Sequence, residues 1–123
     1  MKAFLTIATI AALGLAGATQ AADINGDWAR GDGRARVKIA KCGADICATN
    51  TWIKPGTPSE KAGDVLVMKV KADADGNYAG SAFDPQRDMS YKITLTVKDS
   101  SMTSKGCVLG GLLCKGVNWT RLN

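Results

Sequence analysis

In the stretch Met89-Ser-Tyr-Lys-Ile-Thr-Leu-Thr-Val97, apolar and polar residues alternate without a break over nine residues. This period of two is typical of a β-strand that buries one face and exposes the other. The same alternation recurs at 34–41 and 64–72, and the 3.6-residue period of a helix is found nowhere after residue 22. The chain is therefore predicted to be all-β. The expected strands span residues 26–30, 34–41, 46–53, 64–72, 77–83, 89–98, 101–107 and 116–122.

Short turn sequences separate these strands. Gly31-Asp-Gly33 and Asp75-Gly76 suit hairpin turns, because glycine tolerates the positive φ that such turns require. Asp84-Pro85 ends another strand, and only the connection at 54–63 is long. Eight short strands in hairpin succession predict a small up-and-down antiparallel β-barrel, which leaves no open sheet edge. A β-sandwich of the same strands is the alternative.

The first and last strands of the expected barrel carry a matching pair of motifs. Gly26-x-Trp28 opens the first strand and Trp119-x-Arg121 closes the last. Because the first and last strands pair in a closed barrel, the Arg121 guanidinium is expected to stack on an indole there through a cation–π contact. Trp28, Trp119 and Arg121 are thus the predicted barrel-closing residues. Lipocalin-like barrels resemble this arrangement.

Residues 1–21 are predicted to be a secretory signal peptide that is removed. Lys2 supplies a positive start, residues 4–15 are apolar, and Thr19-x-Ala21 has the small residues of a cleavage site. The apolar run is shorter than the roughly 20 residues of a membrane span. Residues 22–123 then form a single domain with 15 Lys+Arg against 11 Asp+Glu, a net charge of +4. We expect a bacterial protein that is periplasmic or secreted.

The four cysteines suit an oxidising compartment. Cys42, Cys47, Cys107 and Cys114 are even in number, and their x4 and x6 spacings differ from the tight x2 pair of structural zinc sites. Disulfides are therefore favoured over a metal site. Of the three possible pairings, Cys42–Cys47 and Cys107–Cys114 are favoured, since each pair brackets a short reversal of the chain. Two such links matter because residues 23–123 hold only 19 Leu, Ile, Val and Phe.

An ordered set of motifs runs through nearly all of the expected domain, about residues 26–122. In order, the motifs are Gly26-x-Trp28, Val37-x-Ile39, Cys42-Gly43-x-x-x-Cys47, Asp84-Pro85, Tyr91, Gly106-Cys107 and Trp119-x-Arg121. Together they resemble the bacterial exported family catalogued as domain of unknown function 2147. The resemblance implies a small periplasmic β domain. It carries over no activity and no catalytic residue.

Several classes of function are disfavoured by the composition. The chain has no histidine, which removes the commonest general base and the commonest metal ligand, so no enzyme, catalytic residue, metal or cofactor is expected. Nucleic acid is disfavoured as a partner because the domain is only mildly basic.

The densest positive region is predicted either to meet an anionic envelope component or to be a solvated strand face. Its residues are Arg30, Arg34, Arg36, Lys38 and Lys41.

Apolar residues offer candidate ligand contacts. The barrel interior either is filled by its side chains or holds one small ligand. The loop between the last two cysteines is predicted to be a lid on the barrel mouth or, alternatively, a contact patch. The candidate ligand-binding residues are Leu109, Leu112, Leu113, Trp52, Tyr78 and Tyr91, with Met68, Met89 and Met102 as further interior candidates.

We expect a monomeric, non-enzymatic protein that does not span the membrane. It is expected to bind a small apolar or amphipathic ligand or an envelope component, or alternatively to be a protein–protein adaptor.

Overall fold

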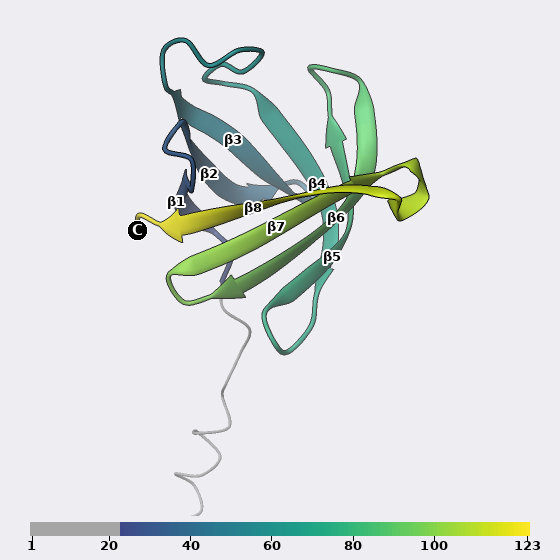
Figure 1. The fold of residues 1–123 in the computed structure, drawn as a ribbon. Coiled ribbons are helices and arrows are strands. Elements are labelled where there is room, and N and C mark those ends of the chain that lie inside the picture. The colour runs from purple at the N-terminus through teal and green to yellow at the C-terminus, as the bar shows by residue number, and fades with distance from the viewer. Residues whose placement is uncertain (1–22) are drawn as a thin grey trace, which may run out of the picture.

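The computed structural model describes residues 23–123, which form a closed antiparallel barrel of eight strands (Figure 1). The predicted signal peptide lies outside these residues. The all-β prediction is confirmed, with a barrel rather than a sandwich. The strands are β1 Gly26–Arg30, β2 Ala35–Cys42, β3 Asp45–Ile53, β4 Val65–Ala72, β5 Asn77–Asp84, β6 Met89–Lys98, β7 Ser101–Val108 and β8 Leu113–Arg121.

Each strand pairs with the next along the chain, and β1 pairs with β8 to close the barrel. The closing register sets Trp28 opposite Arg121 and Arg30 opposite Trp119. β8 begins three residues before the predicted start, because the β7–β8 ladder continues outward to the pair Val108 and Leu113. A short 3-10 turn, η1 (Leu109–Gly111), joins these two strands.

The core follows from the alternation of side chains along the strands. On β2, Ala35, Val37 and Ile39 are buried, while the intervening Arg36 and Lys38 are exposed. The stretch that begins at Met89 behaves the same way on β6. Because successive side chains of a strand point to opposite faces, each strand contributes one row to the barrel interior. The buried hydrophobic residues are Ile24, Trp28, Ala35, Val37, Ile39, Met68, Tyr78, Ala82, Ile93, Leu95, Val97 and Met102.

One end of the barrel is closed by the segment that precedes β1. Ile24 and Trp28 are both fully buried, and the Trp28 indole N–H donates a hydrogen bond to the Ile24 carbonyl at 2.9 Å. Arg121 lies over the Trp28 ring, 4.3 Å from its centroid, so the expected cation–π contact is present. The Arg121 guanidinium also donates to the carbonyl oxygens of Asn25, at 3.0 Å, and Asp99, at 2.8 Å. The last strand thus fixes the N-terminal segment across this end.

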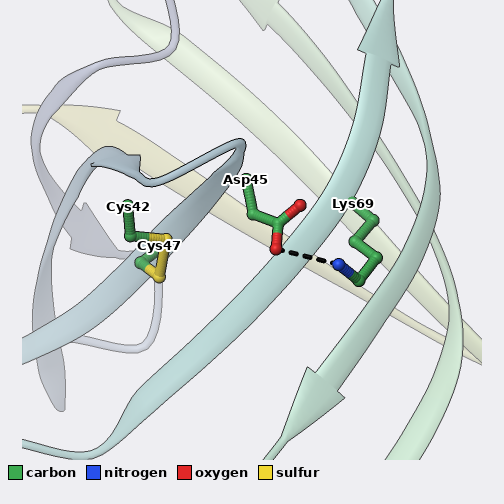
Figure 2. Close-up of a disulfide and its surroundings, with 4 residues drawn as sticks. All are labelled: Cys42, Asp45, Cys47 and Lys69. Carbon is green, nitrogen blue, oxygen red and sulfur yellow. Dashed lines mark hydrogen bonds and ion pairs between the residues drawn. A yellow bond between two sulfur atoms is a disulfide. The ribbon is translucent and has the colours of Figure 1, made fainter.

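Both disulfides join the neighbouring strands of a hairpin. Cys42 and Cys47 link β2 to β3 with their Cα atoms 5.7 Å apart, and Figure 2 shows this bond near the ion pair of Asp45 with Lys69. Cys107 and Cys114 link β7 to β8 across directly opposed positions, with their Cα atoms 4.1 Å apart. The favoured pairing is therefore confirmed. Each bond constrains a short loop, which limits the conformations open to the unfolded chain.

Candidate functional site

The barrel is hollow near the end opposite Trp28, where a cavity of about 220 Å³ opens to the mouth. Its inner wall is apolar because it is built from the inward-facing rows of β2, β3, β4, β6 and β7. Core residues closer to the other end, such as Trp28 and Val97, do not line it. The interior is thus partly filled and partly hollow. The apolar lining comprises Val37, Ile39, Ala48, Leu66, Met68, Ile93, Leu95 and Met102.

An ion pair anchors the long loop at the rim of this cavity. The Arg30 guanidinium at the end of β1 donates to both carboxylate oxygens of Glu60, at 2.7 and 3.0 Å, and it also contacts Asp32 at 3.1 Å. The hydrogen bond from Arg30 holds the pKa of Glu60 below its usual range, and the same bond raises the pKa of Arg30. Both groups are therefore charged at neutral pH, and the segment at 54–64 is held against the mouth.

The turn between β5 and β6 completes the rim on the other side. The Gln86 side chain accepts from the Val65 backbone N–H and donates to the Val65 carbonyl, both at 2.8 Å. Backbone pairing of β4 with β5 begins only at Val67, so Gln86 extends the sheet by one more rung. Arg87 pairs with Asp84 at 2.7 Å and also donates to the carbonyl of Ser59 in the long loop. The two loops of the mouth are thereby joined.

The electrostatics of this turn favour an ionised carboxylate. Burial raises the pKa of Asp84, but hydrogen bonds from Arg87 and Gln86 outweigh that effect and the pKa is lowered overall. The rim therefore presents each of its two cavity-lining arginines, Arg30 and Arg87, already paired with a carboxylate. The positive charge of Arg30 is balanced by Glu60, and that of Arg87 by Asp84.

An overhanging hairpin adds an apolar groove to the mouth. β1 pairs with β8 only from Trp119 to Arg121, so the rest of β8 extends past β1 together with β7. A groove of about 550 Å³ runs beneath this overhang and shares Leu66, Tyr91 and Trp119 with the cavity. Further apolar lining comes from Met89, Val108, Leu113 and Val117. The apolar surface is therefore continuous from the barrel interior to the underside of the hairpin.

Tyr91 occupies the junction of cavity and groove because a glycine faces it. A Cβ atom at Gly106 would lie 2.8 Å from Cε2 of Tyr91, so only glycine lets the ring pack so closely against β7. Burial raises the pKa of the Tyr91 phenol. Beside it, the Trp119 indole N–H donates to the Ser104 hydroxyl at 2.9 Å, which orients the indole in the wall of the site. Trp119 thus pairs with Arg30 in the ladder that closes the barrel and also lines the cavity, whereas Trp28 lies buried at the other end.

Of the six predicted ligand-binding residues, Tyr91 lies in the cavity wall and Leu113 lines the groove. The further interior candidates all lie at the site, with Met68 and Met102 in the cavity and Met89 in the groove. Leu109 and Leu112 are 72% and 87% exposed, so the predicted lid does not form: η1 buries no residue. Tyr78 is buried in the core and does not line the cavity.

Trp52 also differs from the prediction, since it lies on the outer surface. A bulge in the β2–β3 ladder shifts the register between Arg36 and Val37, so that Val37 faces Asn50 while Arg36 faces Trp52. The extra residue turns Trp52 outward, where it is 39% exposed and lies beneath the Arg36 guanidinium, 5.2 Å from the ring centroid.

The densest positive region of the sequence, from Arg30 to Lys41, is divided by the fold. Arg36 and Lys38 lie exposed on the outer face of β2, as the solvated-face alternative expects, while Arg30 turns into the mouth and binds carboxylates. Sequence reasoning missed Glu60 and Gln86 as site residues. One feature of the sequence distinguishes Glu60, which is the only glutamate in the chain.

Within residues 23–123 the structure contains no helix long and apolar enough to cross a membrane. Comparison with curated proteins and with solved structures gave no match. A family model matches residues 26–121, which cover all eight strands of the barrel and both disulfides. The chain therefore belongs to the family described as an uncharacterized protein conserved in bacteria, domain of unknown function 2147.

Proposed function

We propose that this protein is a non-enzymatic, monomeric binding protein of the bacterial periplasm that takes a small amphipathic molecule into the open end of its barrel. The observation that carries the proposal is the 220 Å³ cavity with an apolar wall and a polar rim. A concave, mostly apolar site with a few placed polar groups is the usual form of a small-molecule site.

The volume limits the apolar part of the ligand. A cavity of about 220 Å³ equals the liquid volume of roughly seven water molecules, and an apolar cavity of about 150 Å³ is known to accept benzene. A ring system or a short alkyl chain therefore fits inside the barrel. The groove beneath the β7–β8 overhang offers apolar surface to any part that extends beyond the mouth.

The rim limits the polar part. Arg30 and Arg87 are both engaged by carboxylates, and a ligand anion would have to displace one of these to bind either guanidinium. The rim also presents the side-chain amide of Asn50, which donates one hydrogen bond, to the Lys61 carbonyl at 3.3 Å. These features favour a neutral head group that forms hydrogen bonds over a charged one.

The periplasmic location is supported by three observations. Two disulfides are typical of proteins from oxidising compartments. The family is bacterial, and the N-terminal sequence has the pattern of a secretory signal.

The test is a titration of the protein with the neutral fluorescent amphiphile N-phenyl-1-naphthylamine. Ala48 lines the cavity, so Ala48→Leu fills it without removing a polar group. We expect this variant to bind the probe at least tenfold more weakly. The matched control is Ala79→Leu, because Ala79 is exposed on the outside of β5, and it should bind like the wild type.

A second measurement uses the natural ligand. Native mass spectrometry of protein taken from its own periplasm should show a bound small molecule that is lost on unfolding and reduced in Ala48→Leu. A clean apo mass together with equal probe binding by wild type and Ala48→Leu would overturn the proposal.

A further inference from the structure

We propose that the β7–β8 hairpin docks this protein on an anionic lipid bilayer, with its tip inserted at the interface. The tip is defined here as residues 108–113, the sequence Val-Leu-Gly-Gly-Leu-Leu. The inference rests on Leu109 and Leu112, which line neither the cavity nor the groove, whereas Val108 and Leu113 at the base of the tip also line the groove.

The tip exposes apolar side chains that the fold leaves uncovered. Leu109, Leu112 and Leu113 are 72%, 87% and 62% exposed, the three highest values among the large exposed hydrophobic residues of the described chain. The hairpin projects to one side of the barrel (Figure 1), so its end can approach a flat surface ahead of the rest of the molecule. Exposed leucines gathered on one projection mark an interaction site.

The conformation of the tip is constrained from two sides. The Cys107–Cys114 disulfide clamps its base, and the Leu112 N–H donates to the Leu109 carbonyl at 3.2 Å across the turn. Leu109 itself has φ 55°, in the left-handed region that a leucine rarely adopts. The disulfide and this hydrogen bond therefore hold the leucines in a fixed arrangement, which lowers the entropy lost when they bind.

The charges behind the tip complement an anionic surface. Residues 105–116 contain Lys105 and Lys115 and no Asp or Glu. Lys115 follows directly after Cys114, and Lys92 on β6 lies opposite Cys107. From Lys115 to Leu112 the chain spans about 10 Å at the rise of an extended strand. With the leucines at the acyl boundary, the lysines would lie at the level of the phosphates.

The size of the tip favours a bilayer over a protein partner. A stable protein interface buries about 800 Å² on each side and uses roughly 20–30 residues. Six residues at the end of a narrow hairpin fall well short of that. Interfacial insertion needs only a few apolar side chains supported by basic residues.

The experiment is co-sedimentation of the exported, oxidised protein with vesicles. One set contains three parts phosphatidylcholine to one part phosphatidylglycerol, and the other contains phosphatidylcholine alone. We expect binding to the anionic vesicles that weakens at high salt. Replacing Leu109→Ser and Leu112→Ser together should lower the partition coefficient on the order of tenfold or more.

Matched controls separate insertion from general attraction. Leu122→Ser removes a leucine that is 49% exposed at the other end of the barrel, and it should leave the partition coefficient unchanged. Lys105→Gln should weaken binding about fivefold, and Lys38→Gln on the outer face of β2 should weaken it less. Each variant is first checked for an unchanged unfolding midpoint, as expected for exposed positions.

Three outcomes would overturn the inference. The first is no binding to anionic vesicles. The second is binding that the two leucine substitutions leave unchanged. The third is a lipid-free dimer that these substitutions convert to a monomer, since a second copy would then cover the tip. Probe binding in the barrel is measured separately, so failure here is distinguishable from failure of the proposed function.

Discussion

Arg121, in the last strand, lies over the ring of Trp28, in the first, with its guanidinium carbon 4.3 Å from the centroid of the buried indole. The two residues face each other in the register that closes the barrel. The same guanidinium holds the segment before β1 through backbone carbonyls. One side chain thus links both ends of the folded chain and seals one end of the barrel.

We predict that Arg121→Ala lowers the free energy of unfolding by about 2–3 kcal/mol, because it removes the cation–π contact and the hydrogen bonds to Asn25 and Asp99. Urea denaturation followed by tryptophan fluorescence measures this. Arg36→Ala is the control, since Arg36 also stacks on an indole but on the exposed outer surface. It should cost less than about 1 kcal/mol. Equal losses in the two variants would contradict the assigned role.

The ion pair of Arg30 with Glu60 should make stability depend on pH. Because folding lowers the pKa of Glu60, its contribution is fully present above the unfolded pKa, near the ordinary value of 4.5, and is lost as pH falls through the folded pKa. We expect the free energy of unfolding, measured by urea denaturation, to be about 1 kcal/mol higher for the wild type than for Glu60→Gln at pH 7. The difference should shrink steadily between pH 5 and pH 3. A difference that is constant over that range would show that Glu60 acts only through packing.

Loss of either disulfide should destabilise the domain. The chain-entropy relation gives about 2–2.5 kcal/mol for each of these short loops. We therefore expect Cys42→Ser with Cys47→Ser, and separately Cys107→Ser with Cys114→Ser, to lower the guanidinium midpoint markedly. Reductant should lower the guanidinium midpoint of the wild type more than that of either double variant, because the wild type loses two disulfides and each variant loses one. A wild type that keeps its midpoint in reductant would contradict this prediction.

Glycine substitutions should separate backbone contacts from side-chain contacts. A Cβ at Gly80 would lie 2.0 Å from the Lys69 carbonyl oxygen, and backbone cannot move aside easily, so Gly80→Ala should cost about 3 kcal/mol or more. At Gly106 the obstacle is the Tyr91 ring, which can rotate away, so Gly106→Ala should cost about 1–2 kcal/mol.

Gly116→Ala provides the reference for this series, because its nearest neighbour is at an ordinary 3.9 Å. Thermal unfolding should rank the three variants in the order 80, 106, 116, from most to least destabilised. If Gly106→Ala cost no more than Gly116→Ala, the strands around Tyr91 would be less closely packed than the structure indicates, and if it cost more than Gly80→Ala, the Tyr91 ring would be unable to rotate away.

The strands were predictable to within three residues because alternation is a local property of the sequence. Val37 and Ile39, for example, had to share a face, and hydrophobic burial fixes which face that is. The disulfide pairing was predictable for the same reason, since each pair lies within one hairpin. Trp52 was not, because a bulge between β2 and β3 reverses its direction, and nothing local to the residue reveals the extra position.

By itself, the sequence determined the eight strands, the inward rows of most of them, the local disulfides and the meeting of Trp28 with Arg121. Only the tertiary structure decided that the barrel stays hollow below its mouth, that Glu60 reaches back to Arg30, and that the leucines of the last hairpin face outward. The physical reason is range. Period and turn chemistry act over a few neighbouring residues, whereas a cavity or a rim forms only when strands distant in sequence close into one ring.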